Sequence, residues 1–113
     1  MEYIDRCLII LRPKEPFLAW LKSLPDPVDY SLEDLRGDAK GVLIPDFDGE
    51  DELDDFLTAH AVELFEAELE DWWTEKALWP KVRDEKTFQQ WFDIEFHSTV
   101  ADLVEEDYAA DAN

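Results

Sequence analysis

The chain has 113 residues, which is enough for one domain with a single hydrophobic core. Hydrophobic residues make up 46% of the sequence, and this excludes the low hydrophobicity that is typical of intrinsically disordered chains. The 30 acidic and 10 basic residues give a formal net charge of −20. This charge argues against direct binding of DNA, RNA or an anionic membrane, because proteins bind those partners through Lys and Arg.

The first half of the chain predicts two strands separated by helical segments. Residues 3–12 contain a continuous apolar run, as expected for a strand that is covered on both faces. A short helix is expected over residues 15–24, and Ser31 is placed to cap a brief helical turn after it. Residues 39–44 form a second apolar strand. This order predicts a βαβ unit, whose crossover is right-handed if the strands are parallel.

The second half of the chain predicts two long helices. Residues 50–73 carry an apolar stripe at helical spacing, and residues 74–83 form a connector that Pro80 interrupts. Residues 84–107 contain no Gly or Pro, and Phe88 and its neighbours recur on one side of a helix. These two helices are expected to be antiparallel.

The predicted fold class is therefore α/β, with a small βαβ unit whose two strands are covered by two long C-terminal helices. A sheet of two strands is marginal alone, so the helices must supply its cover. The single α/β domain is expected to span residues 1–108. Residues 109–113 are expected to form a frayed C-terminal tail.

An acidic block follows the second predicted strand. No Lys or Arg occurs between Lys40 and Lys76, whereas Asp and Glu recur throughout. A helix that rises about 1.5 Å per residue and carries carboxylates every few residues can resemble a row of phosphates. This pattern predicts a module that binds a basic protein, and a nucleic-acid mimic or inhibitor is one form of it; the alternative is a solvated acidic face. The acidic residues expected to contact the partner are Glu50, Asp51, Asp54, Asp55, Glu63, Glu66, Glu70 and Asp71.

Three tryptophans, Trp72, Trp73 and Trp79, cluster around the connector together with basic residues. Trp and Arg are typical anchors of protein interfaces, so these tryptophans are also candidates for partner binding. The alternative is that they cover the core where the two long helices meet. A structural homodimer formed through them, with no ligand, is a further hypothesis.

His60 lies within the apolar stripe of the acidic helix, with Glu68 near the same stripe. Glu95 falls among the aromatic residues of the last predicted helix. A buried charge needs a partner, and a contact of His60 with Glu68 or Glu95 would supply one. Such a pair could serve an enzyme as a general acid and base, or could bind a small ligand. The alternative is a hydrogen-bonded core histidine, which is favoured because no nucleophile or oxyanion site accompanies it.

A turn with Asp46, Asp48 and Asp51 offers oxygen ligands of the kind that hard cations prefer. The spacing does not match an EF-hand loop, because Asp51 occupies the sixth position, where Gly is required. Asp93 and His97 are four residues apart, but two ligands do not complete a zinc site. The sequence therefore predicts no cofactor, and these aspartates are the only metal candidates it offers.

Three segments, RCLIILRPKEPFLAW, LIPDFDGEDEL and WFDIEFHSTVADL, resemble a group of small acidic bacterial proteins without an assigned function. The resemblance extends over nearly the whole chain and implies a bacterial cytosolic protein, but no catalytic residue. A cytoplasmic location is also expected because Cys7 is the only cysteine and cannot form an internal disulfide. Neither a secretory signal nor an apolar run of about eighteen residues is recognisable.

Overall fold

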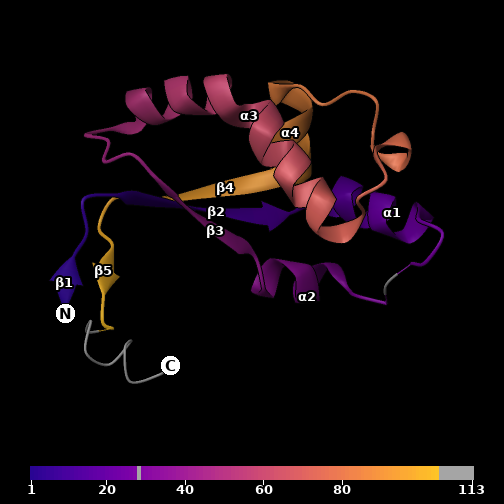
Figure 1. Cartoon of the computed structure of the whole chain (residues 1–113), viewed down its shortest axis with the longest axis horizontal. Coiled ribbons are helices and arrows are strands. Elements are labelled where there is room, and N and C mark those ends of the chain that lie inside the picture. The colour runs from indigo at the N-terminus through magenta and orange to yellow at the C-terminus, as the bar shows by residue number, and fades with distance from the viewer. Residues whose placement is uncertain (28, 105–113) are drawn as a thin grey trace.

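A three-stranded antiparallel sheet lies at the centre of the computed structural model, which describes residues 1–27 and 29–104 (Figure 1). The strands are arranged in the order β3-β2-β4, so β2 is the central strand and hydrogen-bonds to a neighbour on each side. The three strands are β2 (Cys7–Pro13), β3 (Lys40–Ile44) and β4 (Phe92–His97).

The two faces of the sheet differ in burial. Cys7, Ile9 and Leu11 of β2 are buried against the helices, whereas the alternate residues Leu8 and Ile10 are only half-buried on the other face. This alternation follows from the two-residue period of a strand. The prediction that the first strand is fully covered on both faces is therefore only partly correct.

Helices precede, separate and cover the strands. In Figure 1, α3 and α4 lie together on one side of the sheet, and α2 lies on the opposite side of the picture, next to β3. The helices are α1 (Glu15–Ser23), α2 (Leu32–Gly37), α3 (Glu50–Trp72) and α4 (Glu85–Trp91), with a short 3-10 helix η1 (Lys76–Leu78) in the connector. A separate antiparallel pair, β1 (Glu2–Tyr3) and β5 (Ala101–Asp102), lies away from the helices (Figure 1).

The predicted helices of the first half and the long acidic helix are confirmed. The Oγ atom of Ser31 accepts a hydrogen bond from the backbone N–H of Asp34 at 3.1 Å. The Asp34 carboxylate accepts one in return from the Ser31 N–H at 3.0 Å, which completes a capping box. In α3, the buried residues Leu53, Leu57 and Ala61 follow the helical period.

Four phenylalanines join the sheet to three helices in the core. Phe17 of α1, Phe65 of α3, Phe88 of α4 and Phe92 of β4 are each at most 1% exposed. The ring centroids of Phe17 and Phe92 are 5.0 Å apart, and those of Phe88 and Phe92 are 5.3 Å apart. Aromatic pairs at these distances stabilise a core beyond their buried area alone.

The predicted helix over residues 84–107 is wrong from Phe92 to Val104, because the chain continues directly into strand β4. Residues 105–107 of that prediction lie outside the described residues. Phe92, Ile94 and Phe96 alternate with three polar residues, and this two-residue period fits a strand. The alternation overrides the helical spacing because β4 supplies a second hydrogen-bonding neighbour for β2. A two-stranded sheet would lack that neighbour.

The coarse prediction of an α/β fold is confirmed, but its finer topology is not. The strands β2 and β3 are antiparallel, so the segment between them is not a parallel βαβ crossover. The cover of the sheet comes from one long helix and the shorter helices rather than from two long C-terminal helices. Residues 105–108 of the predicted domain and the predicted tail over residues 109–113 lie outside the described residues.

Candidate functional site

The N-terminal half of α3 presents an acidic face, which we define as Glu50, Asp51, Asp54 and Asp55. All four residues are exposed, and none forms an ion pair with another described residue. Acids in the first turn interact favourably with the helix N-terminus. Like charges three or four residues apart, such as Asp51 and Asp55, repel each other by about 0.2–0.5 kcal/mol per pair. The face is therefore a concentrated negative surface that its own helix only partly stabilises.

The predicted partner-binding acids farther along α3 are mostly paired within the chain. Glu63 contacts the Nδ1 atom of His60 at 3.1 Å, and Glu66 accepts a hydrogen bond from the Nε atom of Arg83 at 2.9 Å. Asp71 pairs with Lys40, and Glu70 is exposed. The unbalanced charge of α3 is thus greatest at its N-terminal half.

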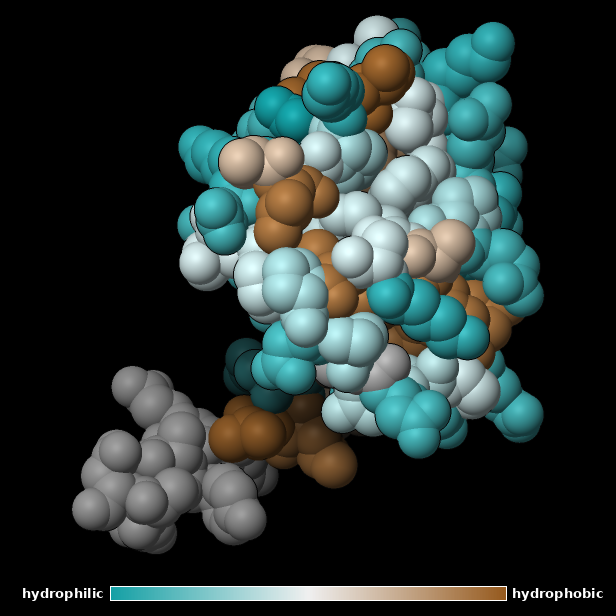
Figure 2. All heavy atoms as spheres, turned by 90° about the vertical axis from the view of Figure 1, so that its right-hand side faces the viewer, coloured by the Kyte–Doolittle hydropathy of each residue, from teal (hydrophilic) through white to brown (hydrophobic). Residues whose placement is uncertain are grey.

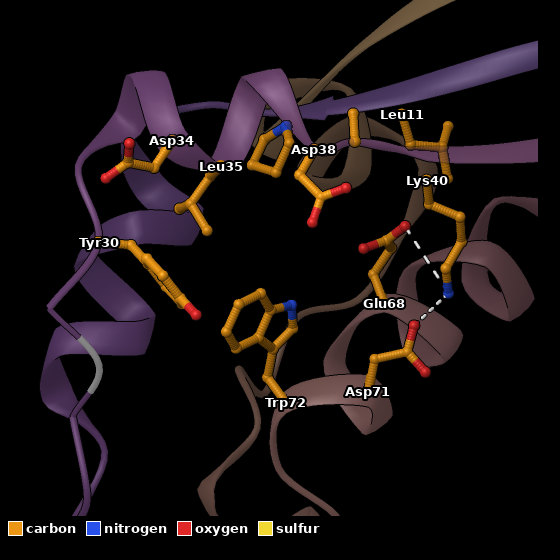
Figure 3. Close-up of a pocket in the computed structure, with 11 residues that line it drawn as sticks. Leu11, Tyr30, Asp34, Leu35, Asp38, Lys40, Glu68, Asp71 and Trp72 are labelled. Carbon is orange, nitrogen blue, oxygen red and sulfur yellow. Dashed lines mark ion pairs between the residues drawn. The ribbon is translucent and has the colours of Figure 1, made fainter.

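A pocket of about 460 Å³ opens between α2, the edge strand β3 and the C-terminal half of α3 (Figure 3). Small-molecule sites in proteins typically have volumes of about 300–1,000 Å³, so the pocket can hold a small group. Its polar and aromatic lining residues are Tyr30, Asp34, Asp38, Lys40, Glu68, Asp71 and Trp72.

Glu68 is the only buried charged residue in the described part of the chain, and its side chain is 7% exposed. It lies on the inward side of α3, two turns after Ala61 and one turn after Phe65, so the helical period places it against the sheet. Its Oε1 atom has no hydrogen-bond partner among the described residues, although the Nζ atom of Lys40 is 3.8 Å away. Such a distance is an ion pair rather than a hydrogen bond.

Burial raises the pKa of Glu68 to about 7. The positive charge of Lys40 lowers this pKa, and the nearby carboxylate of Asp71 raises it, but both effects are smaller than that of burial. A carboxyl group with such a pKa gains or loses its charge near neutral pH. Perturbed carboxyl groups of this kind are concentrated at functional sites.

Aromatic residues and further carboxylates border the same pocket. The rings of Tyr30 and Trp72 meet edge to face, with centroids 5.8 Å apart. The carboxylate of Asp38 and that of Glu68 point into the open space beside the Trp72 indole (Figure 3). Asp34 is engaged in the capping box of α2, whose hydrogen bonds from Ser31 hold the Asp34 pKa below its usual value.

The structure does not bring His60 together with Glu68 or Glu95. His60 has a side chain that is 42% exposed, stacks against Phe56 with ring centroids 4.3 Å apart, and contacts Glu63. Glu95 lies on the outward face of β4, where it contacts Arg12 at 3.5 Å and His97 at 2.6 Å. Because residues 92–97 form a strand rather than a helix, Glu95 points away from α3. The predicted histidine–carboxylate site is therefore not assembled.

The metal candidates are also separate. Asp46 accepts a weak hydrogen bond from the Cys7 thiol at 3.9 Å, and the Asp48 backbone N–H donates to Glu52. Asp51 lies on the acidic face. Across residues 1–27 and 29–104, no group of three or more His, Cys, Asp or Glu side chains is arranged to hold a metal ion.

The three connector tryptophans have different environments. Trp79 is 5% exposed, and its Nε1–H donates a hydrogen bond to the backbone oxygen of Trp73 at 2.7 Å. The cations of Lys76 and Arg83 lie 5.7 and 5.6 Å from the Trp79 ring centroid. Trp79 therefore belongs to the core, whereas Trp72 lines the pocket.

On the face shown in Figure 2, the described hydrophobic residues form separate patches between hydrophilic ones.

Sequence reasoning missed Lys40, Tyr30 and Asp38 as members of one site. A usable signal was present for Lys40, because it shares an inward strand face with Val42 and Ile44. A lysine in such a position needs an acidic partner on the element that covers it. No local signal placed Tyr30 or Asp38 next to α3.

No family model, curated protein or solved structure matches the chain. None of the helices within residues 1–27 and 29–104 combines the length and apolar character needed to cross a membrane. The acidic face and the pocket are therefore the two features of the molecule that bear on its function.

Proposed function

We propose that this protein is an acidic binding module that engages a basic protein surface through the acidic face of α3. The observation that carries the proposal is that Glu50, Asp51, Asp54 and Asp55 are exposed together and lack an ion pair with any other described residue. A partner rich in Lys and Arg would supply the missing positive charge. Complementary surface charge of this kind speeds association and selects among partners.

The rigidity of α3 supports the proposal. The helix spans Glu50–Trp72, and Leu53 and Leu57 anchor the half that carries the acidic face. The backbone of a packed helix does not have to be ordered when the partner binds, which favours affinity. Further acids follow toward the C-terminus of α3, and a longer basic surface could displace the internal partners of Glu63, Glu66 and Asp71. Nucleic-acid mimicry is one form of this function.

The test compares two triple charge reversals. Asp51, Asp54 and Asp55 are changed to Lys in one variant, and Asp5, Asp26 and Asp29, which are exposed elsewhere, are changed to Lys in the other. Both variants have the same net charge, so they separate the position of the charge from its amount. Wild type and both variants are used as baits for a bacterial lysate, with elution by rising salt and with duplex DNA as competitor.

We expect the wild type and the second variant to retain the same basic protein, and the α3 variant to lose it. Release of that protein by DNA would support mimicry of phosphates. Equal retention by the α3 variant and the wild type would show that the acidic face is not the binding surface.

A further inference from the structure

We propose that the pocket between α2 and α3 binds a guanidinium group, the cationic head of an arginine side chain. The inference rests on the proposed function, because a basic partner supplies such side chains. It concerns a different surface from the acidic face, at the opposite half of α3. The pocket would give the module selectivity for arginine, whereas the acidic face responds to positive charge in general.

The charge balance of the pocket favours a cation. Glu68, Asp71 and Asp38 surround it, and Lys40 is the one basic residue of its lining. Lys40 is shared between Glu68 and Asp71, and the Asp38 side chain makes no hydrogen bond or ion pair with a described residue. An incoming cation therefore meets carboxylates that the chain itself neutralises only in part.

Glu68 points to a ligand because it is an acceptor without a hydrogen-bonded donor. Its side chain is 7% exposed, its Oε1 atom lacks a hydrogen bond within the described residues, and it lines the pocket that Figure 3 shows. The Oε1 atom faces Lys40, whereas the other carboxylate oxygen of Glu68 points into the pocket and makes no hydrogen bond with a described residue (Figure 3). A donor group that enters the pocket can hydrogen-bond to this second oxygen, and the charge on both groups would strengthen the hydrogen bond.

The shape of the pocket favours guanidinium over ammonium. Guanidinium is planar, carries five N–H donors in a fixed fork, and stacks on aromatic faces. The pocket offers separated carboxylates on Asp38 and Glu68 and an aromatic border of Tyr30 and Trp72. A lysine ammonium would satisfy one carboxylate as a point charge and would gain less from the aromatic border. Binding in a space of about 460 Å³ also suits a single side chain.

The experiment titrates the protein at pH 8 with N-acetyl-arginine amide, its neutral citrulline analogue and the lysine analogue, and follows binding by calorimetry and NMR. Glu68→Gln removes the charge with little change in shape, and Asp5→Asn, at an exposed position outside both the pocket and the acidic face, removes one charge as the matched control. We expect arginine amide to bind at least about tenfold more tightly than citrulline amide and more tightly than lysine amide. Glu68→Gln should lose that preference, and Asp5→Asn should keep it.

A second pair of ligands distinguishes the source of the guanidinium group. These ligands are a short lysine-rich peptide with one arginine and the same peptide with citrulline in its place. Preference for the arginine peptide supports a partner's side chain as the ligand. Preference for arginine amide alone supports a free guanidinium compound in the same pocket. Equal binding of arginine and citrulline ligands, or full binding by folded Glu68→Gln, would overturn the inference.

The pH dependence offers an independent readout. The groups that face Glu68 are Lys40 from β3, Asp71 from α3, and Asp34 and Asp38 from α2 and its C-terminal end. Because a bound cation favours the ionised carboxylate, and the Glu68 pKa in the empty pocket is about 7, arginine amide should bind more tightly at pH 8 than at pH 6. This difference should vanish in Glu68→Gln. Loss of arginine binding with intact binding of the basic protein would reject the pocket proposal and leave the acidic face in place.

Discussion

The Nζ atom of Lys40 on the edge strand β3 lies 3.8 Å from the Oε1 atom of Glu68 on α3, and the same ammonium group pairs with Asp71. One cation therefore serves two carboxylates near the C-terminus of a helix, where negative charge is unfavourable. Glu68 is the more buried of the two, so its charge depends most on Lys40. This contact links the pocket, the sheet edge and the long helix.

We expect Glu68→Gln to stabilise the fold at pH 8. The folded-state pKa of Glu68 is about 7, above its ordinary value of 4.5, so the folded protein binds more protons than the unfolded chain between these pH values. Stability therefore falls as pH rises from about 4.5 to about 7, and the loss, at most roughly 3 kcal/mol, is complete above that range. Gln carries no such charge. Urea unfolding of both proteins at pH 5 and pH 8 measures the difference, and an equal difference at both pH values would contradict the prediction.

Lys40→Met should destabilise the fold at pH 8 by about 1–3 kcal/mol, because it leaves Glu68 and Asp71 without their shared cation. The cost should be smaller in the Glu68→Gln background, where one of the two charges is absent. A double-mutant cycle by urea unfolding measures this coupling. Lys22→Met, at an exposed position of α1, is the control and should change stability by less than about 0.5 kcal/mol. Additive effects of the two substitutions would mean that Lys40 and Glu68 are not coupled.

Substitutions of Trp79 test whether it is a core residue. Trp79→Ala should cost about 3–5 kcal/mol, because it removes a large buried side chain. Trp79→Phe keeps most of that burial but loses the hydrogen bond to the Trp73 backbone oxygen, and it should cost about 1 kcal/mol. Thermal unfolding measures both values, and light scattering measures the mass in solution. An altered mass with unchanged stability would instead support the homodimer hypothesis.

Amide hydrogen exchange distinguishes the strand β4 from a continued helix. Because β4 is an edge strand that pairs with β2 on one side only, about every second amide from Phe92 to His97 should exchange slowly. A helix would protect consecutive amides over the same residues. The amides of α3 from Leu57 to Leu69 provide an internal reference for continuous protection. Unbroken protection from Glu85 to His97 would contradict the strand.

Local sequence patterns predicted much of the fold because they depend on neighbouring residues. The period of Leu53, Leu57 and Ala61 predicted α3, and Ser31 as an N-cap predicted the start of α2. The alternation in residues 92–97 was also visible, but the aromatic spacing of the preceding turn favoured a helix. The helical period and the two-residue period of a strand both fit residues 92–97. The sequence could not decide between them, because the choice depends on the free edge of β2.

The acidic character of the chain and the position of its acids along α3 follow from the amino-acid order alone, because charge and helical period are local properties. The pocket does not follow from that order. Its formation required β3 to pair with β2, so that Lys40 faced Glu68, and α2 to return Asp38 and Tyr30 to the same place. These contacts join residues far apart in the sequence. Their energies depend on burial and on distances between side chains, which arise only when the strands and helices pack together.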